Sequence, residues 1–276
     1  MADELPDEFI EKVRTAVKRV GPDKFLLGEV WEDATTKFGF DKRRTYLLGK
    51  GLDSVMNYPF KNAVLDFVKG KPAEQAMTEI LTICEHYPAP AIDTALNFLS
   101  THDTERALTV IADEPANGRG RAWQSGRCVT GDAYEEGLLR LRMAYAIIYT
   151  LPGVPCLYYG DEIAMQGYRD PFNRAFFRWD AHEQRLRPVL AQLAQLRHTC
   201  EAFRTGQLRV LRAEDGILHY QRVGKVETAE IIVNRTEHII VETLASGKST
   251  EVNPMGFTIV VEEVGHNPNH SYYDYV

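Results

Sequence analysis

The sequence predicts an α/β fold: half of a TIM-type (β/α)8 barrel, followed by a small antiparallel β-sandwich. Helical segments alternate with four short apolar segments that end in polar residues, which is typical of a parallel sheet covered by helices. A closed barrel needs eight strands, so four indicate half of one. After about Cys200, short β-branched runs separated by Gly, Asp, Asn and Ser favour a sandwich. We predict the half barrel over 1–200, an all-β domain over 201–264 and a tail without assigned structure over 265–276.

Hydrophobic periodicity and breaker residues locate the individual elements. The predicted helices are Glu4–Val20, Asn62–Glu85 with a break near Gly70–Pro72, Glu135–Thr150 and Gln184–Cys200, and a Gly- and Arg-rich loop is expected over Asn117–Gly131. The predicted parallel strands are Phe25–Trp31, Leu52–Met56, Ala95–Leu99 and Val154–Tyr159. The predicted sandwich strands are Leu208–Leu211, Ile217–Arg222, Ala229–Val233, His238–Thr243 and Phe257–Glu262.

Composition excludes several classes of protein. A hydrophobic fraction of 44% and a charged fraction of 26% are ordinary for a globular chain, and no apolar run approaches a membrane span. The charged start Met1–Glu4 is no signal peptide, so we expect a cytoplasmic location and no membrane partner. The net charge of −7 argues against nucleic acid and suits a neutral or cationic small molecule. The cysteines lack CxxC spacing, which favours free thiols over disulfides or a metal site.

Polar residues at the predicted strand ends indicate the chemistry. Acids lie at three of these ends, namely Glu29, Asp103 and the pair Asp161 and Glu162. Tyr58 and His102 lie at comparable ends, and Trp31 and Phe60 are aromatic residues nearby. Converging carboxylates with aromatic surface suit sugar chemistry, because an oxocarbenium-like transition state needs a proton donor and nearby negative charge. An acid that donates needs a raised pKa, for which Val30 and Trp31 offer apolar neighbours and Asp103 a like charge. The alternative for Asp103 is a helix N-cap.

Four segments carry a family resemblance: Gly28–Trp31, Val55–Phe60, Phe98–Asp103 and Gly153–Glu162. In this order, they resemble the α-amylase superfamily of retaining glycoside hydrolases, and most closely its neopullulanase, cyclomaltodextrinase and maltogenic amylase branch. The resemblance covers roughly Ala2 to Asp180. It implies barrel strands 5–8, the family's C-terminal β domain, and an α-glucan or maltooligosaccharide substrate; whether the bonds cleaved are α-1,4 alone or also α-1,6 stays open.

The resemblance also implies roles for residues. Glu29 resembles the general acid/base, which protonates the leaving oxygen and then deprotonates the incoming water or hydroxyl. Asp103 resembles the third carboxylate of the family, which holds sugar hydroxyls and distorts the ring. The expected substrate-binding residues are His102, Trp31, Tyr58, Asp170 and Arg174. For Asp170 and Arg174 the alternative is a surface ion pair, and Asp161 and Glu162 resemble a structural pair outside the catalytic set.

One departure from the family concerns the nucleophile. The family's nucleophilic aspartate lies in an Arg-x-Asp-x-Ala segment, and Ala2–Pro6 resembles the stretch on the carboxyl side of that segment. Asp3 aligns three residues too far along to substitute. We therefore expect a C-terminal fragment or one product of a split gene, inactive as this chain, because no glycosyl-enzyme intermediate forms without the nucleophile. We expect no cofactor and no metal site here; calcium is known in the superfamily, with most of its ligands upstream.

A half barrel exposes strand edges and an apolar face, so we expect self-association or pairing with a missing N-terminal half. Two other functions remain open. The first is a non-catalytic sugar-binding or assembly module derived from such an enzyme. The second is an unrelated metal-dependent hydrolase that uses His102 and Asp103, which is disfavoured because no second histidine lies at ligand spacing.

Overall fold

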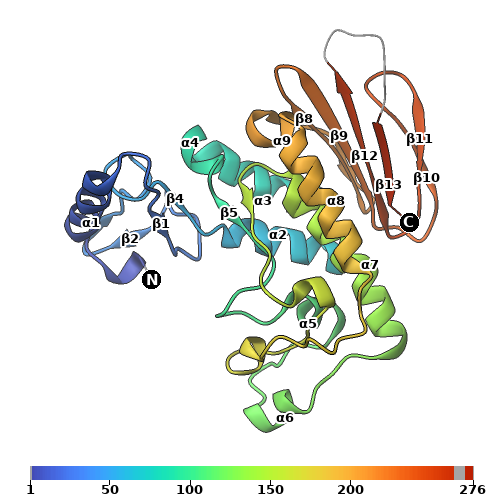
Figure 1. The fold of residues 1–276 in the computed structure, drawn as a ribbon, viewed down its shortest axis with the longest axis horizontal. Helices are drawn as coiled ribbons and strands as arrows, with labels where there is room; N and C mark the ends of the chain where they lie inside the picture. The colour runs from blue at the N-terminus through green and yellow to red at the C-terminus, as the bar shows by residue number, and fades with distance from the viewer. Residues whose placement is uncertain (1, 264–270, 276) are drawn as a thin grey trace.

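The computed structural model describes residues 2–263 and 271–275. Figure 1 shows α1 and the first strands at one end of the molecule, a layered β region at the other, and α2, α3, α7 and α8 between them. The helices are α1 (Asp7–Val20), α2 (Tyr58–Lys69), α3 (Ala73–His86), α4 (Ala89–Ile92), α5 (Ala107–Ala112), α6 (Arg121–Ser125), α7 (Gly131–Thr150), α8 (Leu186–Thr199) and α9 (Ala202–Thr205). None of these helices is both long enough and apolar enough to cross a bilayer.

The first six strands are short: β1 (Leu27–Gly28), β2 (Phe38–Gly39), β3 (Lys42–Arg43), β4 (Ser54–Val55), β5 (Leu96–Asn97) and β6 (Val154–Pro155). The later strands are longer: β7 (Gln207–Glu214), β8 (Ile217–Val223), β9 (Glu227–Asn234), β10 (Ile240–Thr243), β11 (Ser249–Val252), β12 (Gly256–Glu263) and β13 (Ser271–Tyr275). β2 and β3 form a hairpin in the loop after β1.

Four of the short strands lie in parallel and in chain order. β1 pairs with β4, Met56 next to β4 bridges to Leu96, and β5 pairs with β6. Each strand is shorter than predicted. In the last one, Pro155 has no N–H to donate, and the chain turns at Gly160, whose φ is 87°. The order β1–β4–β5–β6 places all four carboxyl ends at one edge.

The helical boundaries differ from the predictions for local reasons. The break between α2 and α3 falls at Gly70–Pro72 as predicted, and Gly70 has a φ of 128°. α2 begins at Tyr58 because the Asn57 side chain accepts a hydrogen bond from the Phe60 amide at 3.3 Å. The segment predicted as the loop Asn117–Gly131 contains the short helix α6.

The β region is antiparallel, as predicted. One sheet has the order β13–β12–β9–β8–β7, and the β10–β11 hairpin packs against it through Ile232, Leu244, Val252 and Val260. The predicted tail needs a correction, because Ser271–Tyr275 forms β13 and pairs with β12. This strand covers what would otherwise be an open sheet edge, and its tyrosines favour extended backbone. The rest of the predicted tail, 265–270 and 276, lies outside the described residues.

Two arginines bind carbonyls at the end of α7, the buried Arg222 from the β region and the half-buried Arg197 from α8. Arg222 in β8 donates to the Thr150 carbonyl at 2.7 Å, and Arg197 in α8 donates to the Tyr149 carbonyl at 3.0 Å. The Tyr220 hydroxyl lies 2.6 Å from the Thr150 hydroxyl. Burial lowers the pKa of both arginines to about 10, which still leaves them charged at neutral pH. These contacts supply partners for carbonyls that a helix end leaves unpaired.

Candidate active site

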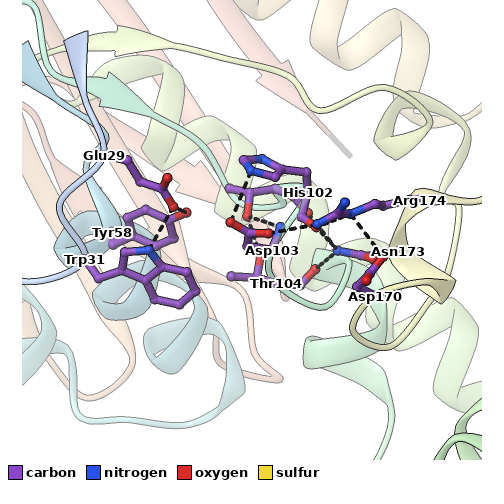
Figure 2. Close-up of polar contacts among 10 residues, drawn as sticks. Glu29, Trp31, Tyr58, His102, Asp103, Thr104, Asp170, Asn173 and Arg174 are labelled. Atoms are coloured by element: carbon purple, nitrogen blue, oxygen red, sulfur yellow. Dashed lines mark hydrogen bonds and ion pairs between the residues drawn. The ribbon is translucent and has the colours of Figure 1, made fainter. Parts of the chain in front are cut away.

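The predicted site residues lie along the edge where the four parallel strands end. Glu29 follows β1, Tyr58 follows β4, and His102 and Asp103 follow β5. Arg174 belongs to the long loop after β6. Figure 2 shows these side chains one beside the next, with the carboxyl of Glu29 toward Asp103 and Arg174 on the far side of Asp103. This is the edge at which parallel α/β folds place their chemistry.

Aromatic residues hold the carboxyl of Glu29. The indole Nε1 of Trp31 donates to Glu29 Oε1 at 2.9 Å, and the Tyr58 hydroxyl lies 3.5 Å from the same oxygen. The rings of Trp31 and Tyr58 stack, with centroids 4.5 Å apart and planes 10° apart. Burial raises the pKa of Tyr58 to about 12, so its hydroxyl stays a donor at neutral pH. Trp31 is therefore a hydrogen-bond donor as well as the expected aromatic surface, and Val30 belongs to the hydrophobic core.

Basic groups hold the carboxyl of Asp103. Arg174 Nη2 lies 2.9 Å from Asp103 Oδ1, and His102 Nε2 lies 3.1 Å from Asp103 Oδ2. Asp103 is not the N-cap of the following helix, because α5 begins only at Ala107, whose amide donates to Ser100 Oγ at 2.8 Å. The helix-cap alternative for Asp103 is thereby excluded.

The two carboxylates and the histidine converge. The ligand-type atoms of Glu29, His102 and Asp103 all lie within 4.8 Å of one another. Glu29 and Asp103 are half-buried, and the His102 side chain is 51% exposed. The two acids are therefore close enough to contact one small ligand.

Asp170 and Arg174 form an ion pair, and one of them extends into the site. Arg174 Nε lies 3.2 Å from Asp170 Oδ1 and donates to the His102 carbonyl at 2.8 Å. Asp170 itself is exposed and contacts Asp103 only through Arg174. The structure thus places Arg174 against Asp103 and leaves Asp170 at the margin.

A buried asparagine that the sequence pattern did not single out supports this loop. Asn173 is fully buried, and its Nδ2 lies 3.2, 2.7 and 2.8 Å from the carbonyls of Thr101, His102 and Thr104. These bonds tie the loop of Arg174 to the turn that carries Asp103. No hydrophobic pattern marks such a residue, although it lies between the two residues that were predicted.

A second buried cluster lies beneath the turn. Arg106 is fully buried, donates to the Tyr159 carbonyl at 2.7 Å and lies 3.3 Å from Asp161 Oδ1. The Tyr145 hydroxyl donates to Asp161 Oδ2 at 2.5 Å. Burial raises the pKa of Asp161 to about 6 despite these partners. Asp161 therefore lies outside the converging group, in line with the structural role that the resemblance implied.

Glu29, His102 and Asp103 also have the atom types that bind zinc, with Glu29 instead of a second histidine at ligand spacing. Both oxygens of Asp103 already have partners, and the Arg174 guanidinium at 2.9 Å opposes a divalent cation. The arrangement of charges favours a neutral hydroxyl-bearing ligand over a metal ion.

Comparison with known proteins identifies the family. The model of the alpha amylase catalytic domain matches residues 4–207. Because this match covers most of the chain, the protein belongs to the α-amylase family. The resemblance inferred from the four sequence segments is confirmed.

Individual relatives point to the predicted branch. The chain is 32% identical over 242 residues to a cyclomaltodextrinase of Geobacillus thermopakistaniensis (strain MAS1), covering 86% of this chain and 36% of the relative. It is 30% identical over 259 residues to neopullulanase 2 of Thermoactinomyces vulgaris, and the match covers 91% of this chain and 39% of the relative. The ligand-free cyclic alpha-maltosyl-(1→6)-maltose hydrolase from Arthrobacter globiformis has a TM-score of 0.78 and 25% identity, with 94% of this chain and 54% of that chain covered. The chain thus spans little more than a third of these curated relatives and about half of the solved structure.

Proposed function

We propose that this chain provides the acid/base side of a retaining α-glucan glycoside hydrolase site on strands 5–8 of a (β/α)8 barrel. The observation that carries the proposal is the approach of Glu29, His102 and Asp103 to within 4.8 Å at the ends of parallel strands. The membership of the α-amylase family supports it, as do relatives named for cyclomaltodextrin and pullulan cleavage.

Each side chain has a part in the proposed reaction. Glu29 donates its proton to the leaving glycosidic oxygen and later takes one from the attacking water. Trp31 orients this carboxyl through Oε1, which leaves Oε2 for the transferred proton. Asp103 and His102 hold hydroxyls of the same sugar, while Arg174 keeps Asp103 in place. Trp31 presents its ring beside the sugar, and the buried Tyr58 stacks behind it.

The nucleophile belongs, in this proposal, to a segment that precedes the residues described here. The Ala2 amide donates to the Glu29 carbonyl at 2.9 Å, so residues on the amino side of Ala2 would lie next to Glu29. Asp3 is engaged elsewhere, because it accepts from the Tyr46 hydroxyl at 2.7 Å and lies 3.1 Å from Lys37 Nζ. This chain alone would then bind α-glucans without forming a covalent intermediate.

A sugar-binding module without turnover is the second candidate. It is favoured by one observation: in the described part of the chain, no further acid lies within 4.8 Å of all three converging residues.

An assay with a chromogenic maltoside tests the first proposal. We expect no turnover by this chain alone, and turnover once a half barrel carrying the missing aspartate is added or fused upstream. Glu29→Gln should then lower turnover about 10²–10⁴-fold, as loss of general acid/base catalysis does. Activity that survives Glu29→Gln would contradict the role of Glu29, and a combined protein that binds maltotriose without turnover would establish the binding module.

We also propose that the open sheet pairs with such an upstream half barrel. In the described residues, β1 and β6 each have one strand neighbour, so each leaves an edge unpaired. Apolar side chains lie beside both edges: Phe25 is 50% exposed and Val154 is 44% exposed. Light scattering of the chain with and without the upstream half checks this. A 1:1 complex is expected, a homodimer alone would indicate self-association instead, and a monomer with no dye-binding apolar surface would contradict both.

A further inference from the structure

An open hollow of about 500 Å³ lies between α1 and the turn at 49–50. Four basic side chains line it: Arg14, Lys18, Arg19 and Lys50. Glu11 is the acid in the lining, and Asp53 lies behind it, paired with two of the basic side chains. Lys24 and Asp23, which are close by, pair with each other. Four cations against two acids leave a local formal charge of +2, on a chain whose net charge is −7.

Two of the cations are held in place by Asp53. Arg14 Nη1 lies 2.7 Å from Asp53 Oδ1, and Lys18 Nζ lies 2.9 Å from Asp53 Oδ2. The Leu26 amide also donates to Asp53 Oδ2, at 2.7 Å. Burial acts to raise the pKa of Asp53, but these donors outweigh it and lower the pKa, so the acid is ionised at neutral pH. Leu26 and Asp53 precede β1 and β4, so the hollow lies by the amino ends of these strands, whereas Glu29 follows the carboxyl end of β1.

Several donors of the hollow have no partner among the described residues. Arg19 and Lys50 form no ion pair or side-chain hydrogen bond there, and Arg14 donates only through Nη1, which leaves its Nε and Nη2 free. The amides of Gly49 and Lys50 also donate to no described group. Gly49 is exposed, its φ is 87°, and a Cβ there would meet nothing within 4 Å. The hollow thus combines three basic side chains and two backbone amides whose capacity to donate is unused.

We propose that this hollow binds an anion of the phosphate type, with two or more negative charges. Guanidinium groups offer forked donors that match phosphate oxygens, an ammonium group adds a point charge, and backbone amides at a turn are suited to anions. The local excess of two positive charges favours a dianion over a singly charged ion. The volume leaves room for a diphosphate or a sugar phosphate. This site is independent of the proposed function, because none of its residues belongs to the converging group.

Titration calorimetry of the full chain with inorganic pyrophosphate tests the proposal. Arg19→Ala should weaken binding about tenfold, as expected for loss of a hydrogen bond between charged groups. Lys12→Ala is the matched control, because Lys12 is an exposed cation of the same helix that does not line the hollow. This control should change the affinity less than about twofold. Glu11→Gln should strengthen binding about twofold, because it removes the acid that opposes the anion.

Amide signals in ¹⁵N NMR locate the bound anion. Pyrophosphate should shift the signals of Gly49 and Lys50 and leave the indole signal of Trp31, which reports on Glu29 and which maltotriose should shift, unchanged. A shift of Trp31 without one at Gly49 would overturn the proposal, as would no binding at all. Equal weakening by Arg19→Ala and Lys12→Ala would also overturn it, since attraction would then follow net charge alone. Tighter binding of glucose 6-phosphate than of pyrophosphate, with the same two amides shifted, would support the site and identify a sugar phosphate as its ligand.

Discussion

The two carboxylates of the candidate site are held in opposite ways. Glu29 lies against stacked aromatic rings, one of them buried, and receives its hydrogen bond from an uncharged indole. Asp103 lies between an arginine and a histidine whose side chains are 45% and 51% exposed. Packing orients the first acid, whereas ion pairs orient the second. The orientation of the proposed proton donor should therefore depend little on ionic strength, and that of the sugar-holding acid should depend on it more.

The largest effect is expected for the buried Asn173, which supports the turn that carries the more exposed of the two carboxylate environments, that of Asp103. Asn173→Ala removes the donor for three carbonyls, so the free energy of unfolding should fall by about 3 kcal/mol. Denaturant titration measures this, with Asn62→Ala, which replaces an exposed asparagine within α2, as the control. An Asn173→Ala variant as stable as the parent would show that the turn of Asp103 is held by other contacts.

The buried acid beneath the turn predicts a pH dependence. Burial raises the pKa of Asp161 from 3.8 to about 6, so between these values the folded state binds more protons than the unfolded state. The contribution of Asp161 to the free energy of unfolding should therefore fall as pH rises from about 4 to 6. We expect the difference in stability between Asp161→Asn and the parent to change in this pH range. A constant difference would mean that Asp161 is ionised throughout.

Replacement of Trp31 tests the packed side of the comparison. Trp31→Phe keeps a ring beside Tyr58 but removes the donor to Glu29, a loss of about 1.5 kcal/mol for a bond to an ionisable group. Turnover by the combined enzyme should fall about tenfold, by nearly the same factor at low and high salt. A salt-dependent loss would contradict the distinction between the two carboxylates.

Arg174→Lys tests the ionic side and should have a smaller effect. An exposed pair contributes about 0.5 kcal/mol, so turnover should fall less than about threefold at low salt. At 0.5 M salt, a concentration at which screening acts over about 4 Å, the parent and the variant should converge. A loss as large as that of Trp31→Phe, unaffected by salt, would show that Arg174 contacts the sugar directly.

Chelation should have the smallest effect of all. Because Arg174 opposes a cation beside Asp103, EDTA should leave the maltotriose-induced shift of the Trp31 signal unchanged. Loss of that shift with EDTA, and its return with zinc, would restore the metal-dependent alternative.

Fold and site were most predictable from the sequence where local pattern and topology act together. Glu29 and Asp103 follow apolar strand segments, and parallel strands bring their carboxyl ends to one edge, so their approach was predictable. The hydrogen bonds that hold the site residues in place were not predictable in the same way. Asn173 bonds to carbonyls about 70 residues away in the chain, and Ser100 rather than Asp103 accepts from the first amide of α5. These partners depend on how two loops pack against each other, and hydrophobic periodicity in the sequence does not predict loop packing.

The arginine contacts at the end of α7 have a consequence for how this protein can be divided. A polypeptide shortened after residue 200 would lack Arg222 and Tyr220, and Thr150 would lose their two contacts in a place that water cannot readily reach. The β region and the helices are thus expected to unfold together, and neither should be stable alone. Heating should melt both in one calorimetric transition, and limited proteolysis near residue 200 should release no stable piece.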